Sequence, residues 1–159
     1  MDNNSKKVMF SSKTVEWGTP RDFYEKLNKK YSFTLDACAS ANNAKCENYF
    51  TLAQDGLRQD WSGHTVFCNP PYGKEIKAWV RKAYIESQKD DTEVILLIPA
   101  RTDTDYFHKY CMKAASVYFV KGRLKFESED GKASNSAPFP SIVVHFKSGS
   151  SGNPDMLGL

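Results

Sequence analysis

The sequence has little that would support a metal centre, a membrane span or a disulfide framework. Its four cysteines form no CxxC pair and have no zinc-site spacing. No apolar region follows the polar segment Met1–Lys7, which argues against a secretory signal. The longest apolar stretch, Val94–Pro99, is far too short to cross a bilayer. We therefore expect free thiols, no metal ion, no membrane association and a cytoplasmic location.

The sequence also lacks a large excess of charge of either sign. Lys and Arg total 22 against 19 acidic residues, a net charge of +3 over 159 residues, which permits a polyanionic partner without requiring one. The hydrophobic content of 40% excludes wholesale disorder, and the length fits one domain with its own core. We expect a disordered segment at 1–12, a folded domain at 13–147 and a flexible, Gly- and Ser-rich tail at 148–159.

The folded part alternates strand and helix patterns. The first helix is expected from Pro20 to about Lys30, with Thr19 as its cap, and two more should follow near 76–83 and 105–114. Apolar runs predict strands at 33–37, 65–68, 94–98, 117–120, 122–126 and 142–146. This alternation predicts an α/β fold with a mostly parallel, doubly wound sheet. The last two strands have no helix between them, which favours an antiparallel pair at one edge.

Polar residues follow three of these strands where each one ends. They are Asp36, the tetrapeptide Asn69–Tyr72 and the segment Pro99–Thr102. In doubly wound sheets, ligands bind outside the carboxyl ends of the strands. We therefore expect the three segments to converge in one crevice.

The tetrapeptide Asn69-Pro70-Pro71-Tyr72 carries the most specific chemical signal. Its two prolines fix the backbone and lack N–H groups, so the Pro70 carbonyl is held out as an acceptor beside the Asn69 side-chain oxygen. Two fixed acceptors suit a planar amine, and Tyr72 offers a flat face for stacking. The alternative is an ordinary Pro-Pro turn in which Asn69 is only a turn residue.

A second candidate feature is basic. Lys121, Arg123 and Lys125 alternate along a strand-like stretch, which would place their side chains on one face. Such a face is either a phosphate-contacting stripe or simply a solvated surface. Arg101, after a central strand, lies at the rim of the expected crevice and could meet a phosphate or pair with Asp103.

Seven segments together resemble the phage-type DNA adenine N6-methyltransferase (Dam) family. The tetrapeptide alone is shared with glutamine and RNA-amine methyltransferases, whereas the full series is much more specific and extends from about residue 11 to 146. The segments are Trp17–Pro20, Leu35–Ser40, Asp60–Trp61, Cys68–Gly73, Pro99–Thr104, Gly122–Phe126 and Ser136–Ser141. The resemblance implies a single, minimal Rossmann-like methyltransferase domain that uses S-adenosylmethionine.

The resemblance also implies roles for individual residues. Asn69, Pro70 and Tyr72 would hold the target adenine, with Pro71 completing the catalytic motif. Three groups of residues would bind the cofactor: Trp17, Thr19 and Pro20 at its methionine end, Asp36 with Ala37 and Ser40 in the first cofactor motif, and Asp60 near its adenine. Broader amino-methyltransferases usually carry glycines after the first acid, and this chain instead has Ala37, Cys38 and Ala39.

The implied reaction is in-line attack of adenine N6 on the sulfonium methyl group, without a covalent enzyme intermediate. The implied partner is double-stranded DNA, with the target base flipped out of the stack and Arg101, Lys121, Arg123 and Lys125 near the phosphates. The enzyme would act as a monomer or homodimer, in the host-cell cytoplasm if phage-encoded, with protection from restriction as one possible purpose. Two alternatives stay open: an amine methyltransferase acting on RNA adenine or protein glutamine, and a catalytically inactive nucleic-acid-binding module.

Overall fold

The computed structural model describes residues 17–150 and 152–159, so the segment 1–12 lies outside the described residues. Within that range the chain forms one six-stranded sheet with three α-helices and two 3-10 turns. The strands are β1 (Leu35–Asp36), β2 (Thr65–Cys68), β3 (Glu93–Pro99), β4 (Ser116–Phe119), β5 (Ser141–Lys147) and β6 (Asp155–Gly158). The helices are α2 (Arg21–Tyr31), α3 (Ile76–Ser87) and α4 (Asp105–Lys109), and the 3-10 turns are Gly56–Arg58 and Cys111–Lys113.

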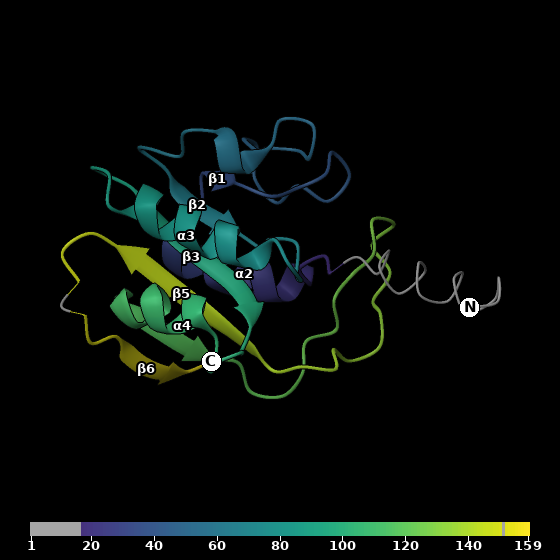
Figure 1. Ribbon diagram of the computed structural model, residues 1–159. Coiled ribbons are helices and arrows are strands. Elements are labelled where there is room, and N and C mark those ends of the chain that lie inside the picture. Colours follow the sequence, from purple (N-terminus) through teal and green to yellow (C-terminus); the bar gives the residue numbers. More distant parts are fainter. Residues whose placement is uncertain (1–16, 151) are drawn as a thin grey trace, which may run out of the picture.

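The sheet has the order β1-β2-β3-β5-β4-β6, with β1 and β6 at its edges (Figure 1). β1, β2 and β3 pair in parallel, β6 pairs in parallel with β4, and β5 is antiparallel to both of its neighbours. The predicted α/β fold with a mostly parallel sheet is confirmed. The antiparallel strand was expected at an edge of the sheet, but β5 lies inside it, between β3 and β4. Residues 141–146 of β5 are buried, and the backbone N–H and C=O groups of a buried strand need hydrogen-bond partners on both sides.

The predicted strand at 122–126 is wrong. Among the described residues this segment has no regular secondary structure. Leu124 and Phe126 still face the core while Arg123 and Lys125 are exposed. The alternation of side chains that suggested a strand is therefore real, but it reflects one-sided packing of an extended loop without a strand partner.

The prediction of a flexible tail at 148–159 is also wrong for its last part. Asp155 N donates to Ala115 O at 3.0 Å, and Leu159 N donates to Phe119 O at 2.9 Å, so β6 completes the outer edge of β4. All four residues of β6 are exposed. Backbone hydrogen bonds, which satisfy the otherwise unpaired edge of β4, hold this strand in place, and its sequence carries no burial pattern.

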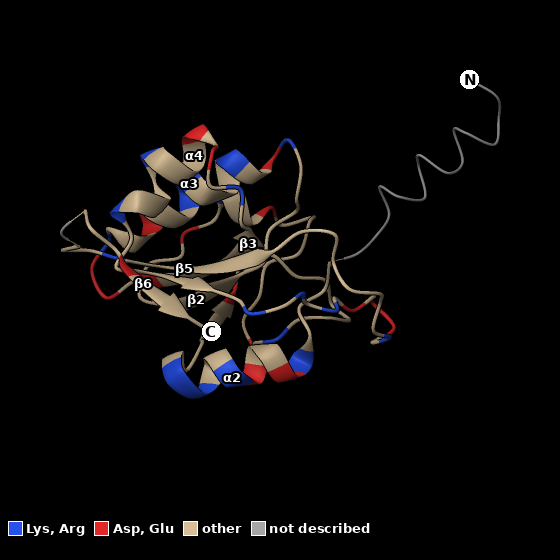
Figure 2. Ribbon diagram, turned by 90° about the horizontal axis from the view of Figure 1, so that it is seen from below, with Lys and Arg blue, Asp and Glu red and all other residues tan. Residues whose placement is uncertain are grey.

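The core lies on both faces of the sheet, with α2 on one side and α3 and α4 on the other (Figure 2). β3 shows the division most clearly because its side chains alternate between the two faces. Val94, Leu96 and Ile98 pack in the α3 layer, and Ile95 and Leu97 pack in the α2 layer. All five are fully buried, which explains why this strand is the longest apolar run in the sequence.

The start of α2 shows how tertiary contacts override a local signal. The helix was expected to begin at Pro20, but it begins at Arg21, and Pro20 stands at the cap position without a side-chain cap. The carboxylate of Glu127 instead accepts from Arg21 N at 3.2 Å, a hydrogen bond across 106 residues. Thr19 is not the cap because its hydroxyl has another partner, Asn69.

Candidate active site

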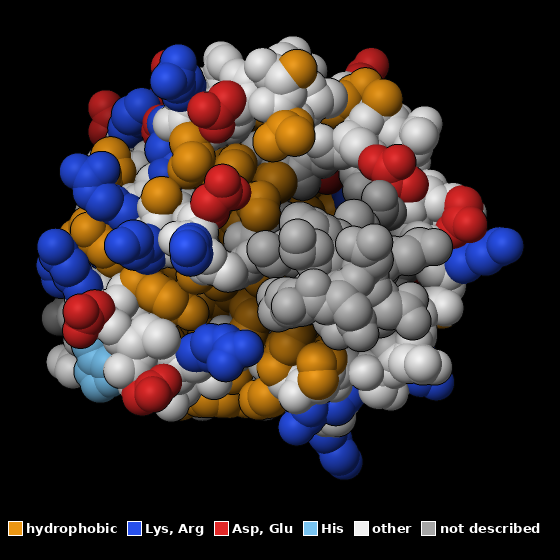
Figure 3. Space-filling view, turned by 45° about the vertical axis from the view of Figure 1, so that its right-hand side comes forward, with side chains coloured by type: hydrophobic (Ala, Val, Ile, Leu, Met, Phe, Trp, Pro, Cys, Tyr) orange, Lys and Arg blue, Asp and Glu red, His pale blue; other side chains and the backbone are white. Residues whose placement is uncertain are grey.

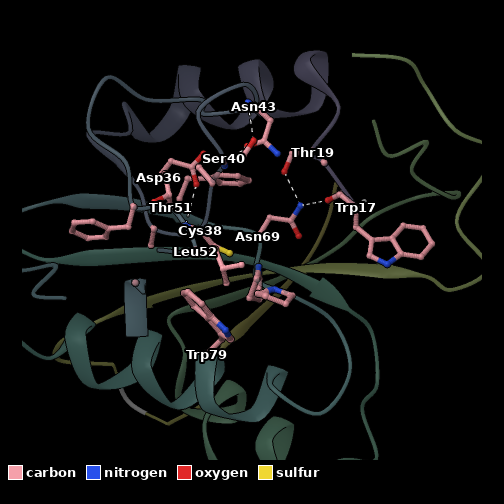
Figure 4. Close-up of a pocket in the computed structure, with 18 of the residues that line it drawn as sticks. Trp17, Thr19, Asp36, Cys38, Ser40, Asn43, Thr51, Leu52, Asn69 and Trp79 are labelled. Carbon is pink, nitrogen blue, oxygen red and sulfur yellow. Dashed lines mark hydrogen bonds between the residues drawn. The ribbon is translucent and has the colours of Figure 1, made fainter. Parts of the chain in front are cut away.

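A cavity of about 820 Å³ opens at the carboxyl ends of β1 and β2 (Figure 4). This volume is in the range of pockets that bind a cofactor-sized molecule. Most of its wall comes from four parts of the chain: the segment before α2, the loop after β1, the Asp55–Leu57 turn, and the segment from Asn69 into α3; Phe67 and Glu129 complete it. The lining includes Trp17, Thr19, Asp36, Ala37, Cys38, Ser40, Lys45, Phe50, Asp55, Gly56, Leu57, Asn69, Pro70, Pro71, Tyr72, Glu75 and Trp79.

The loop after β1 is organised by the carboxylate of Asp36. This side chain is only 3% exposed and accepts hydrogen bonds from Lys45 N at 3.1 Å and Cys38 N at 3.4 Å. Burial raises the pKa of Asp36 to about 6, against the opposing effect of those two hydrogen bonds. At neutral pH the cavity wall therefore carries a buried negative charge.

The Asp55-Gly56 turn forms another part of the cavity wall. A Cβ on Gly56 would lie 2.2 Å from the carbonyl oxygen of Ala37 and 3.0 Å from the ring of Trp79, so only glycine fits there. Asp55 accepts from Leu57 N at 3.2 Å, which holds its carboxylate at this turn. Asp55 and Trp79 are lining residues that sequence reasoning missed, and the Asp-Gly pair was the available signal for a tight turn.

The tetrapeptide after β2 places the Asn69 carboxamide between two segments. Its nitrogen donates to the Trp17 carbonyl oxygen at 2.5 Å and to Thr19 Oγ1 at 3.0 Å. Its oxygen accepts from the Tyr72 hydroxyl at 2.7 Å. Burial raises the pKa of Tyr72 well above its usual value, so this hydroxyl stays protonated and available as a donor.

Aromatic rings surround Tyr72 beside this amide. The Trp17 ring is stacked on Tyr72, with ring centroids 6.3 Å apart and an interplanar angle of 24°. Phe126 and Phe139 each meet Tyr72 edge-on, at 6.1 and 5.6 Å. The tetrapeptide is thus bordered by an aromatic group of a kind that accommodates a planar ring.

Five of the seven residues expected to bind a cofactor line this cavity: Trp17, Thr19, Asp36, Ala37 and Ser40. Pro20 and Asp60 are not lining residues. Asp60 is exposed, where its carboxylate accepts from Ser62 N at 3.0 Å and pairs with Lys89 at 3.0 Å. The Ser62 bonds and Lys89 lower the pKa of Asp60. These partners hold Asp60 at the turn before β2, outside the cavity, so the lining does not support the cofactor contact expected for it.

The comparison with known proteins bears on this geometry directly. Residues 7–154 match the sequence profile of the DNA N-6-adenine-methyltransferase (Dam) family. The chain belongs to this family. The Dam-family assignment confirms the resemblance inferred from the sequence, and with it the class of reaction: methylation of adenine in DNA.

Two phage members of the Dam family show how much of the chain is shared. A DNA N-6-adenine-methyltransferase of Haemophilus phage HP1 is 29% identical over 136 residues, covering 82% of this chain and 78% of the phage protein. A DNA N-6-adenine-methyltransferase of Escherichia phage T1 is 32% identical over 117 residues, covering 72% of this chain and 48% of that protein.

The basic residues predicted to contact DNA lie outside the cavity. Arg101, Lys121, Arg123 and Lys125 are all exposed, and the segment Pro99–Thr102 does not line the cavity, so only two of the three strand ends converge there. Arg123 donates to Ala137 O at 3.3 Å, which ties the two sides of the 121–140 loop together. One face of the molecule carries several Lys and Arg side chains beside apolar surface (Figure 3).

Among the described residues, no helix is long and apolar enough to span a membrane.

Proposed function

We propose that this protein binds S-adenosylmethionine in the 820 Å³ cavity and transfers its methyl group to the N6 amino group of an adenine held at Asn69–Tyr72. The observation that carries this proposal is the continuity of the cavity. One lining includes the buried carboxylate of Asp36 after β1 and the whole tetrapeptide after β2. A cofactor bound at the first strand end would therefore face a target base at the second.

The lining suits this cofactor in both charge and shape. S-adenosylmethionine supplies an electrophilic methyl group on a cationic sulfonium, and it also carries a cationic ammonium group. Four acidic residues border the cavity against one basic residue, Lys45, which favours a cationic ligand; the acids are Asp36, Asp55, Glu75 and Glu129. Phe50, Leu57 and Trp79 add apolar surface for its adenine ring and for the methylene groups beside its sulfur.

The tetrapeptide suits the acceptor amine. We expect Asn69 Oδ1 and the Pro70 carbonyl to accept hydrogen bonds from the two N6 hydrogens, while Tyr72 stacks on the base. These contacts would hold the nitrogen in line with the methyl group, and such alignment supplies most of the rate in a direct transfer. A base inside duplex DNA cannot reach this position, so it must be flipped at a cost of a few kcal/mol, which the stacking would offset.

The loop at 121–140 is the proposed contact with the DNA backbone. It extends from the sheet on the side of the tetrapeptide (Figure 1), and its residue Phe139 touches Tyr72. Lys121, Arg123 and Lys125 are exposed on this loop and would neutralise phosphates flanking the flipped base.

A substrate panel tests the proposal. The protein is incubated with tritium-labelled S-adenosylmethionine and separate pools of duplex DNA, RNA and protein, followed by nucleoside analysis of the labelled product. We expect label as N6-methyladenine in DNA, and none with Asn69→Ala. Label in RNA or protein would show that the acceptor is not DNA, while the proposed role of the tetrapeptide would stand. Absence of label in every pool, together with cofactor binding too weak to measure by calorimetry, would favour an inactive nucleic-acid-binding module.

A further inference from the structure

The orientation of the Asn69 amide is decided by the atom that faces it from Trp17. A backbone carbonyl oxygen can only accept a hydrogen bond. The Trp17 carbonyl oxygen lies 2.5 Å from one end of the Asn69 amide, so that end must be the nitrogen. Thr19 Oγ1 is a second acceptor for the same nitrogen at 3.0 Å, and Thr19 is only 4% exposed.

The opposite end of the amide is fixed by a donor. The Tyr72 hydroxyl donates to Asn69 Oδ1 at 2.7 Å. An amide oxygen has two acceptor sites, so one remains for an incoming amine. A flip of the carboxamide would turn its oxygen toward the Trp17 carbonyl oxygen and its nitrogen toward the Tyr72 hydroxyl. Both ends would then lose their hydrogen-bond partners inside a half-buried site, which opposes the flip.

The Trp17–Thr19 segment is itself held by backbone contacts. Gly18 and Glu127 exchange two hydrogen bonds, from Gly18 N to Glu127 O at 2.9 Å and from Glu127 N to Gly18 O at 2.7 Å. A Cβ on Gly18 would lie 2.4 Å from the Glu127 oxygen, so only glycine allows this approach. The segment that supports the Asn69 amide is thus itself paired with Glu127 of the 121–140 loop.

We propose that the Trp17 carbonyl and the Thr19 hydroxyl are positioning groups that aim the Asn69 oxygen at the target amine, and that they make asparagine, not aspartate, the residue this site requires. This inference rests on the proposed function, in which Asn69 Oδ1 accepts from adenine N6. It gives Thr19 a role different from the cofactor contact expected from the sequence, since the Thr19 hydroxyl acts through Asn69.

An Asn69→Asp variant follows directly from this geometry. Its carboxylate would place an oxygen at the position of Nδ2, against the Trp17 carbonyl oxygen, and two acceptors at that distance repel each other. A protonated carboxyl group could instead donate to Trp17. We therefore expect the activity of this variant, relative to wild type, to rise as the pH falls from 8 to 5.5.

The matched pair Thr19→Val and Thr19→Ser separates hydrogen bonding from packing. Valine keeps the shape of the side chain but loses the acceptor, whereas serine keeps the acceptor. For Thr19→Val we expect kcat to fall by about 10- to 100-fold, as for the loss of a polar group that orients a reacting atom, with the Kd for S-adenosylmethionine within about 2-fold of wild type. For Thr19→Ser we expect kcat within about 3-fold of wild type.

An NMR measurement reads the amide without requiring turnover. The side-chain NH₂ signals of Asn69 are identified by their loss in Asn69→Asp. In the wild type and in Thr19→Ser we expect one or both of these protons to be shifted downfield and protected from exchange. In Thr19→Val the shift and the protection should decrease.

These measurements distinguish failure of the inference from failure of the proposed function. Equal kcat and equal amide signals in Thr19→Val and Thr19→Ser would overturn the inference, as would an Asn69→Asp pH profile parallel to wild type. A wild-type protein that methylates no acceptor would overturn the proposed function, and the NMR comparison would then still decide whether Thr19 orients Asn69.

Discussion

The two strand ends that border the cavity are built in opposite ways. After β1, the Asp36 carboxylate is satisfied locally, by backbone N–H groups two and nine residues further along the chain. After β2, the Asn69 amide is held by Trp17 and Thr19, 52 and 50 residues earlier in the chain. The first loop can thus form from its own sequence, while the second acquires its geometry only when distant segments come together.

Under the proposed function, this difference separates two roles that share one cavity. The β1 loop presents a fixed charge, which suits binding of a cation. The β2 turn presents oriented acceptors, which suit the alignment of an amine. Variants on the two sides should therefore affect different quantities, binding of the cofactor on one side and the rate of transfer on the other.

The largest expected effect is on the β2 side. Asn69→Ala removes one of the two acceptors for the target amine, so we expect kcat to fall by about 10³-fold. The Kd for S-adenosylmethionine should change by less than about 2-fold, because Asp36 and its loop are untouched. Single-turnover methylation and isothermal titration calorimetry measure the two quantities, and a parallel loss of both would show that Asn69 has a structural role.

On the β1 side, Asp36→Asn should weaken cofactor binding by about 10-fold through loss of one buried charge. Because burial raises the pKa of Asp36 from 3.8 to about 6, its stabilising contribution to the unliganded fold is present below pH 3.8 and is lost as the pH rises through 6. A cation bound nearby favours the ionised form, so wild-type affinity should increase from pH 5 to 7 and then level off. Calorimetry over this range tests the slope, which should be flatter in the variant.

The 121–140 loop allows a test that leaves both strand ends intact. Removing two exposed cations by the double change Arg123→Ala and Lys125→Ala should weaken DNA binding by about 3- to 10-fold and reduce the salt dependence of log K by about one unit per lost phosphate contact. Fluorescence anisotropy with a labelled duplex at several salt concentrations measures both. The exposed helix residue Lys26 provides a control, since Lys26→Ala should leave the slope unchanged.

The smallest effect is expected at Asp60. Because Asp60 lies outside the cavity and pairs with Lys89, Asp60→Asn should change cofactor affinity by less than about 2-fold. Asp55→Asn, five residues earlier and on the cavity lining, should weaken it by about 5-fold. Calorimetry on the two variants side by side decides which acid belongs to the site, and a reversed order would restore the expectation drawn from the sequence.

What could be predicted from the sequence depended on how locally each feature is encoded. The buried strand β3 and the tetrapeptide were readable because apolar runs and Pro-Pro turns act over a few residues. β6 was not, because all its side chains are exposed and only its backbone is paired. The Thr19 hydroxyl was equally hidden, since a cap for α2 and a partner for Asn69 require the same residue type.

The site shows the same division. Asp36 lines the cavity, and the sequence pointed to this residue because it ends a strand, β1, whose carboxyl end lies at the cavity. Asp60 was expected near the cofactor adenine because the segment Asp60–Trp61 resembles the family, yet the 3-10 turn between the two acids carries Asp55 to the cavity and Asp60 away from it.

The place of β5 within the sheet has a consequence for how the chain folds. β5 lies between β3 and β4, and within the described sheet β4 pairs only with β5 and β6. During synthesis, β3 keeps an open, strongly apolar edge and β4 has no neighbour until residues 141–147 are made. A nascent chain stalled before that point should be prone to aggregation, and refolding should be limited by the late insertion of this one strand into the middle of the sheet.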